Sequence, residues 1–390
     1  MDITTNTTDV SKHEINSVVE TISGSLGNTV RRTLTQLKAL TTDRLQLNNA
    51  PTAESVNDTA SPHILATVIR TTLETHDTKS YFFSTETPLK PYKAGAHINI
   101  EFTANGDRVV RTYTLSSSPK TADEFSITVK RVNHGVASNW LFDHLTPGDQ
   151  INVSQPQGSF VLPYQPAGKL LMLSAGSGIT PVMSMLRYLS QTGNRSDIVF
   201  LNYAQSPSDI IFHDELTALA KSHPNLSILF SVEREALSGE SLEGRINEKQ
   251  VSEVVPDILE REIYLCGPQP FMKATISILN KLEFNPAQLH LENFTADLSG
   301  AAELGYSAEL SFTSINKAVQ AASSKTILEE AEAAGLNPAA ACRIGICKTC
   351  RCKKQSGTTV NLVTGEVSTE EGDYILPCVS VAKTATTVEL

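Results

Sequence analysis

The chain has 390 residues, of which 40% are hydrophobic and 19% charged, a composition typical of a soluble globular protein with about two to four domains. Its formal net charge of −10 argues against a nucleic-acid-binding surface and against simple adhesion to anionic lipid. No apolar run approaches the roughly 20 residues that a membrane-spanning helix needs, and six cysteines without a recognisable export signal favour a reducing, cytoplasmic compartment.

The N-terminal extension is predicted to contain one helix. From Ile15 to Leu40 apolar residues recur at helical spacing, with Arg31, Arg32 and Lys38 beside the apolar stripe. This helix either docks onto a membrane-bound partner or covers the next domain. Residues 48–62 are polar and interrupted by proline, which indicates a linker.

The next part of the chain has short runs in which apolar and polar residues alternate, separated by turn signals such as Pro147-Gly148. This pattern predicts an antiparallel β-barrel, with one short helix from Ser138 to His144. The start of that helix, Gly135-Val136-Ala137-Ser138, offers free N–H groups and a positive potential that favour a phosphate. Alternatively Ser138 is simply the N-cap, and both interpretations can hold together.

One predicted strand of the barrel carries the motif Arg111-Thr112-Tyr113-Thr114-Leu115-Ser116-Ser117. Strand alternation places Arg111 and Tyr113 on one face, where the guanidinium can pair with a phosphate and the phenol ring can lie against an isoalloxazine ring. Thr114 lies on the other side of the pleat and can donate to the flavin near its N5 atom. The motif indicates flavin binding; a strand with a surface arginine is the alternative.

Continuous apolar runs with helical patterns between them follow, and they predict a parallel sheet covered by helices. The first run leads into the glycine turn Gly176-Ser177-Gly178-Ile179-Thr180-Pro181 and then into a helix. Such a turn can hold the pyrophosphate of a dinucleotide at Gly176, Gly178 and Thr180, at the helix N-terminus. Pro181 stands where the dinucleotide fingerprint has its third glycine, and proline is tolerated there near the helix start.

Two further segments of this domain are candidates for nicotinamide contacts. Cys266-Gly267-Pro268 follows a buried strand, so its thiol lies at the carboxyl edge where such sheets bind ligands. A buried cysteine that merely ends a strand is the alternative. At the end of the domain Glu292 can orient the nicotinamide region and Phe294 can cover the flavin, or Glu292 is only the solvent-facing residue of a last strand.

The choice between NADPH and NADH stays open. Gln205, after the second strand, is neutral and does not clamp a 2′-phosphate. Arg234, after the third strand, can still reach that group.

The last part of the chain carries Cys342, Cys347 and Cys350 in the spacing C-x4-C-x2-C, with Cys378 further on. This is the spacing of plant-type [2Fe–2S] ferredoxins. Cys352 is expected to be a strand residue that points away from the cluster. A zinc site or a disulfide framework is the alternative, but zinc sites use paired C-x2-C arms or nearby histidines, and disulfide frameworks suit small secreted chains.

In combination, these motifs resemble the ferredoxin–NADP⁺ reductase superfamily: Arg-x-Tyr-Thr-x-x-Ser at 111–117, Gly-x-Gly-x-x-Pro at 176–181 and Cys-Gly-Pro at 266–268. With the C-terminal cysteines, residues 63–390 are similar to single-chain reductases that carry a flavin and an iron–sulfur cluster. Within that group the chain most resembles the electron-transfer partners of bacterial acyl-CoA desaturases. The stretches that carry this resemblance are 127–130, 158–163, 289–294 and 342–347. One departure is Gly95-Ala96-His97, where such barrels often have Gly-Gln.

The resemblance implies a multidomain fold, with an antiparallel β-barrel flavin domain, an α/β parallel-sheet NAD(P)-binding domain and a β-grasp (α+β) [2Fe–2S] ferredoxin domain. The expected parts are an N-terminal extension with an amphipathic helix and linker at 1–62, the FAD-binding barrel at 63–165, the NAD(P)-binding domain at 166–296, a linker at 297–306 and the ferredoxin domain at 307–390. The implied cofactors are FAD in preference to FMN, NADPH or NADH, and a [2Fe–2S] cluster.

The implied activity is that of an NAD(P)H-dependent oxidoreductase, with Cys266, Thr114 and Glu292 as catalytic residues. The implied cofactor contacts are Arg111, Tyr113, Thr114, Val129, Arg131, Gly135, Val136, Ser138, Gly176, Gly178, Thr180, Pro181, Cys266, Gly267, Pro268 and Phe294, and the implied cluster ligands are Cys342, Cys347, Cys350 and Cys378. The implied acceptor is a diiron fatty-acyl desaturase, which would bring the chain to the inner membrane face. The alternatives are a hybrid-cluster protein or a Rieske-type or other oxygenase, and a redox sensor without turnover.

Overall fold

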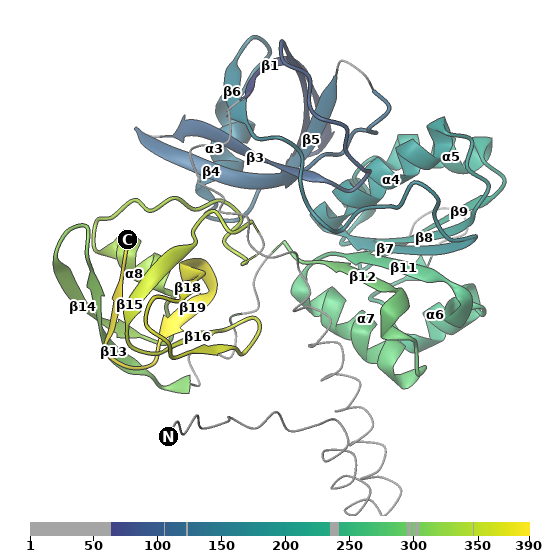
Figure 1. Ribbon diagram of the computed structural model, residues 1–390. Coiled ribbons are helices and arrows are strands. Elements are labelled where there is room, and N and C mark those ends of the chain that lie inside the picture. The colour runs from purple at the N-terminus through teal and green to yellow at the C-terminus, as the bar shows by residue number, and fades with distance from the viewer. Residues whose placement is uncertain are drawn as a thin grey trace, which may run out of the picture. The chain divides into compact units, whose positions relative to one another are not determined.

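The computed structural model describes residues 64–104, 106–121, 124–234, 242–294, 298, 301, 304–345 and 347–390 (Figure 1). The predicted helix from Ile15 to Leu40 and the linker after it lie outside these residues. Within them, no helix combines the length and the apolar character needed to cross a membrane.

Six antiparallel strands form the sheet of the first domain, in the order β4-β3-β6-β1-β2-β5. The strands are β1 (Ile64–Thr75), β2 (Thr78–Thr85), β3 (His97–Ala104), β4 (Asp107–Thr114), β5 (Phe125–Lys130) and β6 (Gln150–Val153). A bridge between Leu115 and Ile127 joins the two end strands, so the sheet curls toward a barrel. The predicted antiparallel architecture is confirmed.

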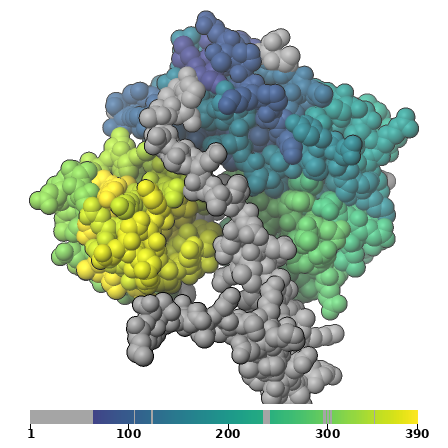
Figure 2. Space-filling view, in the orientation of Figure 1, coloured from purple at the N-terminus to yellow at the C-terminus, as the bar shows by residue number. Residues whose placement is uncertain are grey.

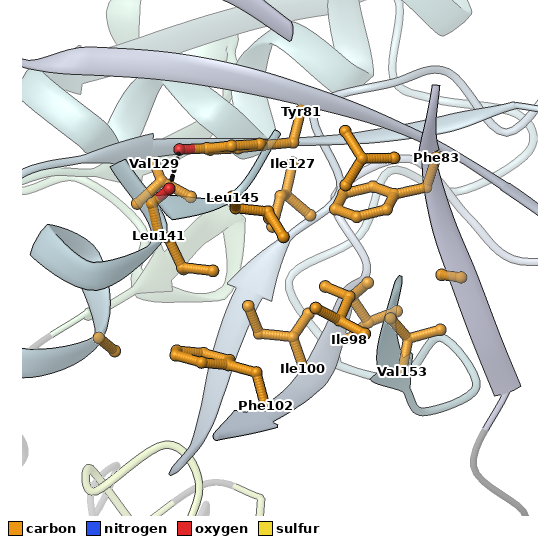
Figure 3. Close-up of a cluster of buried hydrophobic side chains, with 14 of the residues drawn as sticks. Tyr81, Phe83, Ile98, Ile100, Phe102, Ile127, Val129, Leu141, Leu145 and Val153 are labelled. Atoms are coloured by element: carbon orange, nitrogen blue, oxygen red, sulfur yellow. Dashed lines mark hydrogen bonds between the residues drawn. The ribbon is translucent and has the colours of Figure 1, made fainter. Parts of the chain in front are cut away.

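Alternating side chains of these strands fill the barrel core (Figure 3). Ile98 and Ile100 of β3 are fully buried together with Tyr81 of β2 and Leu141 of helix α3 (Val136–His144). The Tyr81 hydroxyl donates to the Leu141 carbonyl at 2.7 Å, and this bond fixes α3 to the sheet (Figure 3). The barrel therefore gives β4, which carries the predicted flavin motif, a rigid support.

The second domain is a parallel sheet in the order β10-β9-β8-β7-β11-β12. Its strands are β7 (Lys169–Ala175), β8 (Asp197–Ala204), β9 (Leu226–Val232), β10 (Leu242–Glu243), β11 (Glu262–Cys266) and β12 (Leu289–Glu292). Its main helices are α4 (Ile179–Gln191), α5 (His213–Ser222), α6 (Glu248–Val254) and α7 (Gln269–Lys281). Helices α4 and α7 lie on opposite faces of the sheet (Figure 1). Along β7, Leu170 and Met172 pack with α4, whereas Leu171 and Leu173 pack with α7. Both faces are covered, which explains why the strand reads as a continuous apolar run.

The third domain is seen as a compact yellow-green lobe in Figure 2. It has a five-stranded sheet in the order β14-β13-β20-β15-β18 and a three-stranded sheet in the order β17-β16-β19. The strands are β13 (Ser307–Phe312), β14 (Lys317–Ala322), β15 (Cys352–Ser356), β16 (Thr359–Asn361), β17 (Val367–Ser368), β18 (Tyr374–Ile375), β19 (Ser380–Ala382) and β20 (Thr386–Val388). Helix α8 (Ile327–Ala333) begins at a capping box between Thr326 and Glu329. The mixed α+β architecture predicted for this domain is confirmed.

Candidate functional site

The end of β4 presents the predicted flavin motif. Arg111 and Tyr113 are half-buried and Thr114 is buried. In the β3–β4 register, Tyr113 lies opposite Ile98, and Thr114 lies opposite His97. Burial lowers the pKa of Arg111, but its ordinary value is so high that the guanidinium stays cationic. Burial raises the pKa of Tyr113, so the phenol stays neutral and can act as a hydrogen-bond donor.

Two residues that the resemblance assigned to the flavin have other contacts here. Val129 is fully buried in the barrel core and pairs with Lys79 of β2. The Arg131 guanidinium pairs with the Asp143 carboxylate and stacks on the Phe142 ring, with 4.3 Å between its Cζ and the ring centroid. Arg131 is therefore held by α3.

Helix α3 begins two residues earlier than predicted, at Val136, because Gly135 is the extended N-cap residue. The interpretation of Ser138 as the N-cap is thus wrong: its Oγ lies inside the first turn and accepts a hydrogen bond from the Val132 N–H at 3.1 Å. A Cβ at Gly135 would lie 2.7 Å from that Oγ, which explains the glycine. Val136 is exposed. The N-terminus of α3 keeps free N–H groups, as phosphate binding requires.

The glycine turn after β7 is built from two different glycines. Gly176 has a φ of +53° and open space where a side chain would stand, so the backbone is accessible to a ligand. A Cβ on Gly178 would lie only 2.3 Å from the Cys266 carbonyl oxygen, so this glycine permits close packing against β11. The Thr180 hydroxyl donates to the Ser177 carbonyl at 3.1 Å, and Pro181 lies in the first turn of α4.

Cys266 and Glu292 are neighbours at the carboxyl edge of the sheet, because they are register partners on β11 and β12. The Cys266 thiol is fully buried, and burial raises its pKa, so it is a neutral thiol near pH 7. Glu292 is 8% exposed, and its Oε2 atom has no hydrogen-bond partner. Glu292 is therefore not the solvent-facing residue that the alternative interpretation assumed. A buried acceptor without a partner suits a ligand that brings a donor.

Other predicted residues surround this edge. Pro268 is the N-cap residue of α7, and a Cβ at Gly267 would lie 2.7 Å from the Phe271 ring, so the segment after Cys266 is tightly packed. Phe294, two residues beyond β12, is 36% exposed and its ring is free to cover a ligand. The Arg234 N–H donates to the Gln205 carbonyl at 2.8 Å, so these two residues lie side by side after β8 and β9.

His97 also lies at this site, although the sequence analysis gave it no role there. Its Nδ1 lies 3.8 Å from Oε1 of Glu292, and both side chains are less than a tenth exposed. The contact joins the first strand residue of β3 to the last of β12. Such a contact is non-local, and the only sequence signal was the unusual Gly95-Ala96-His97 segment.

The four predicted cluster ligands form two thiol pairs. A hydrogen bond from Cys342 lowers the pKa of the Cys347 thiol to about 5, and one from Cys378 lowers the pKa of Cys350. The Cys347 and Ile344 N–H groups point at the Cys342 sulfur, at 3.3 and 3.5 Å. No cysteine is in a disulfide among the described residues.

This arrangement fits a binuclear cluster. Two pairs of thiolates are what two irons need, one pair on each. Gly345 has a φ of +83°, which favours glycine, and a Cβ there would make a tight 3.0 Å contact with the Val379 side chain. Cys352 lies in β15 and in the hydrophobic core, as predicted.

Three family models match the chain, one for each of its three domains and in the same order along the sequence. They are the oxidoreductase FAD-binding domain at 65–162, the oxidoreductase NAD-binding domain at 172–276 and the 2Fe-2S iron-sulfur cluster binding domain at 313–383. The glycine betaine monooxygenase reductase subunit of Chromohalobacter salexigens is 36% identical over 339 residues, which cover 81% of this chain and 92% of that protein. The chain belongs to the ferredoxin–NADP⁺ reductase superfamily.

Other members of this superfamily show similar coverage. The glycine betaine monooxygenase reductase subunit of Pseudomonas aeruginosa is 37% identical over 82% of this chain and 93% of its own length. The stachydrine N-demethylase reductase subunit of Rhizobium meliloti is 34% identical over 76% of this chain and 89% of its own length. The solved structure of phthalate dioxygenase reductase has a TM-score of 0.62 at 24% identity, covers 84% of this chain and 98% of that chain, and so shares the fold.

The three domains together identify this superfamily member as an NAD(P)H-dependent oxidoreductase that transfers electrons through FAD and a [2Fe–2S] cluster. The predicted cofactors are thereby confirmed, with FAD rather than FMN. When bound, the flavin converts two-electron hydride transfer into one-electron steps. The relatives are reductase subunits of oxygenase systems, so a protein acceptor is expected as well.

Proposed function

We propose that this reductase supplies electrons to the oxygenase subunit of a Rieske-type monooxygenase whose substrate is a small N-methylated compound. The supporting observation is that relatives covering three quarters or more of the chain are reductase subunits of glycine betaine monooxygenase and of stachydrine N-demethylase. Both names refer to oxidation of an N-methylated substrate. The predicted desaturase has no counterpart among these relatives, whereas the alternative acceptor, an oxygenase, does.

The nucleotide is proposed to lie along the glycine turn and the edge beyond it. Its pyrophosphate meets the backbone of Gly176, where the space is open, and the N–H groups at the start of α4. The carboxamide of the nicotinamide has N–H donors, and the Oε2 of Glu292, which has no partner, can accept a hydrogen bond from one of them. Cys266, the register partner of Glu292, is a neutral thiol and is proposed to lie against the ring.

The flavin is proposed to lie along the end of β4. Its phosphates meet the cationic Arg111 and the N–H of Val136 at the start of α3, and its ring stacks on Tyr113. The Gly135 N–H itself donates to the Val132 carbonyl at 2.8 Å, so Gly135 contributes its lack of a side chain rather than a donor. The Thr114 hydroxyl is proposed to donate to the ring, and Thr114 lies opposite His97 in the register. Phe294, which is 36% exposed, covers the ring until the nicotinamide displaces it.

The proposal is tested with the purified holoprotein and the purified oxygenase subunit of glycine betaine monooxygenase. With NAD(P)H, oxygen and glycine betaine, the expected product is formaldehyde in a one-to-one ratio to nucleotide consumed, since hydroxylation of an N-methyl group releases it. A matched reaction uses Cys347→Ser, which is expected to reduce ferricyanide but to give no formaldehyde. The desaturase interpretation would be restored if the wild type reduces the dye rapidly and delivers electrons to a desaturase but not to this oxygenase.

The location at the inner membrane face and the docking role of residues 15–40 stay predictions. They are tested by deleting residues 1–50. Docking predicts slower electron delivery to the partner with unchanged dye reduction, whereas equal loss of both activities indicates a structural segment.

A further inference from the structure

Two side chains of helix α4 connect the glycine turn proposed for the nucleotide (the nucleotide turn) to β4, the strand that carries the flavin motif (the flavin strand). Its N-terminus follows the turn at Gly176–Gly178. One and two turns further along, Ser184 donates from its hydroxyl to the Ser117 carbonyl at 2.7 Å, and Arg187 donates from Nη1 to the Ser116 carbonyl at 2.7 Å. Ser116 and Ser117 are the last two residues of the flavin motif. The two hydrogen bonds therefore join the first and second domains at the places where each is expected to bind its cofactor.

The Ser184 hydrogen bond is shielded from water, and the Arg187 hydrogen bond is partly buried. Ser184 and Ser116 are fully buried and Ser117 is 7% exposed. The Ser184 hydroxyl also accepts from the Gly95 N–H at 3.4 Å, so it contacts two separate segments of the barrel. A buried carbonyl that loses its donor is costly, because no water replaces the bond. These contacts consequently hold α4 to the barrel more firmly than surface contacts do.

Arg187 is itself fixed in place. Its guanidinium forms a bidentate pair with Glu215 of α5, at 2.7 and 2.6 Å, and lies over the Phe212 ring at 4.9 Å. A bidentate arginine pair is directional, so Nη1 stays aimed at the Ser116 carbonyl. Arg187 and Glu215 also line a cavity of about 430 Å³, which lies between α4 and the barrel.

On the barrel side, a row of hydroxyls holds the same segment. The Ser117 Oγ accepts from the Ser126 N–H at 2.9 Å, and the Ser116 Oγ lies 2.9 Å from the Ser126 Oγ. Thr128 donates to the Ser116 Oγ at 2.9 Å and bonds in turn to Ser80 at 2.8 Å. Since the segment cannot follow a displaced helix, a shift of α4 changes the distance from the nucleotide turn to the flavin strand.

We propose that Ser184 and Arg187 are positioning residues that fix the distance between the nicotinamide and flavin rings. The inference rests on the proposed placement of the flavin at Tyr113 and of the nucleotide at Gly176. Hydride transfer needs the two rings at about 3–3.5 Å, and a misplacement of about 1 Å can cost on the order of 100-fold in rate. Neither residue touches the reacting atoms, so their loss is expected to slow hydride transfer and to leave binding of each cofactor nearly unchanged.

The test is anaerobic stopped-flow reduction of the flavin-loaded protein by NAD(P)H, with Ser184→Ala and Arg187→Gln. The expected result is a limiting rate of flavin reduction about 10- to 100-fold lower, with KM within about threefold, and loss of the long-wavelength charge-transfer absorbance that stacked nicotinamide and flavin give. In the flavin-free protein, hydrogen exchange of the Gly95 amide is expected to accelerate in Ser184→Ala. The matched control is Ser190→Ala on the same helix, whose hydroxyl contacts His223 inside the second domain.

Rescue by the conservative variant separates positioning from general damage. Ser184→Thr keeps the hydroxyl and is expected to reduce flavin faster than Ser184→Ala. The inference is overturned if Ser184→Ala keeps the wild-type rate, if Ser184→Thr is no faster, or if the charge-transfer band persists at full strength while the rate falls. If Ser184→Ala does not fold, a wild-type rate in Arg187→Gln overturns it. If the flavin of the wild-type protein is reduced normally but no electrons reach the oxygenase, only the proposed acceptor is refuted.

Discussion

The two glycines of the nucleotide turn are expected to respond differently to the same substitution, alanine. In Gly178→Ala the new Cβ would lie 2.3 Å from the Cys266 carbonyl oxygen and 2.7 Å from the Gly267 Cα. All of these neighbours are backbone atoms, which cannot rotate away. To reach ordinary contact at 3.4 Å, either β11 or the start of α4 must move by about 1 Å.

The size of the effect follows from that displacement. Overpacking of this kind costs about 1–3 kcal/mol of folding free energy, and each kcal/mol lowers the melting temperature of a domain of this size by about 2–4 °C. The displaced segment carries Cys266, so hydride transfer is expected to fall on the order of 100-fold in Gly178→Ala. Gly176→Ala meets no atom within 4 Å, and only its φ of +53° is strained, at about 1–2 kcal/mol. Its Cβ occupies the space proposed for the pyrophosphate, so the expected loss is in nucleotide affinity.

Thermal unfolding and stopped-flow reduction at several NAD(P)H concentrations distinguish these outcomes. The control is Gly168→Ala, which meets no atom within 4 Å and lies outside the left-handed region; it is expected to match the wild type. The reasoning is refuted if Gly178→Ala melts at the wild-type temperature and reduces flavin at the wild-type rate. It is equally refuted if Gly176→Ala binds NAD(P)H as tightly as Gly168→Ala does.

Three further predictions concern the cluster and the second domain. Cys347→Ser is expected to lose the visible absorbance of the cluster and the reduction of cytochrome c while keeping ferricyanide reduction through the flavin; a variant that retains two irons per chain contradicts the ligand assignment. Arg261→Ala removes a guanidinium whose side chain is 6% exposed and paired with two carboxylates, so denaturant unfolding is expected to show a loss of about 3–5 kcal/mol, against at most about 1 kcal/mol for the exposed Arg245→Ala. A hydrogen bond from Arg261 lowers the pKa of Asp257 from 3.8 to about 2, so the stability that the Asp257 carboxylate contributes is present above pH 3.8 and is lost as the pH falls through 2. Asp257→Asn should therefore flatten the curve of unfolding free energy against pH in that window. An unchanged curve would show that Asp257 does not contribute to this pH dependence.

Local patterns predicted much of the fold, because each sheet has its own hydrophobic signature. The continuous runs of β7 and β8 reflect a sheet covered on both faces, and the alternation in β3 reflects a barrel with one face outside. The cysteine spacing predicts a cluster site because the loop Cys342–Cys350 holds three of the four proposed ligands within a few residues. Helix α3 is two residues longer than predicted, because Gly135 rather than Ser138 is its N-cap.

The contacts that bring the two cofactor sites together have no such signature. Gly178 against the Cys266 carbonyl, His97 beside Glu292 and Ser184 on the Ser117 carbonyl each join segments far apart in the chain. Periodicity describes one element at a time, so it carries no information on which residue of α4 meets the barrel. Hydride transfer depends on distances between elements more than on the identity of any single motif residue. Substitutions at these contacts between elements are therefore expected to reduce the rate of hydride transfer as much as substitutions within the motifs do, while the cofactors stay bound.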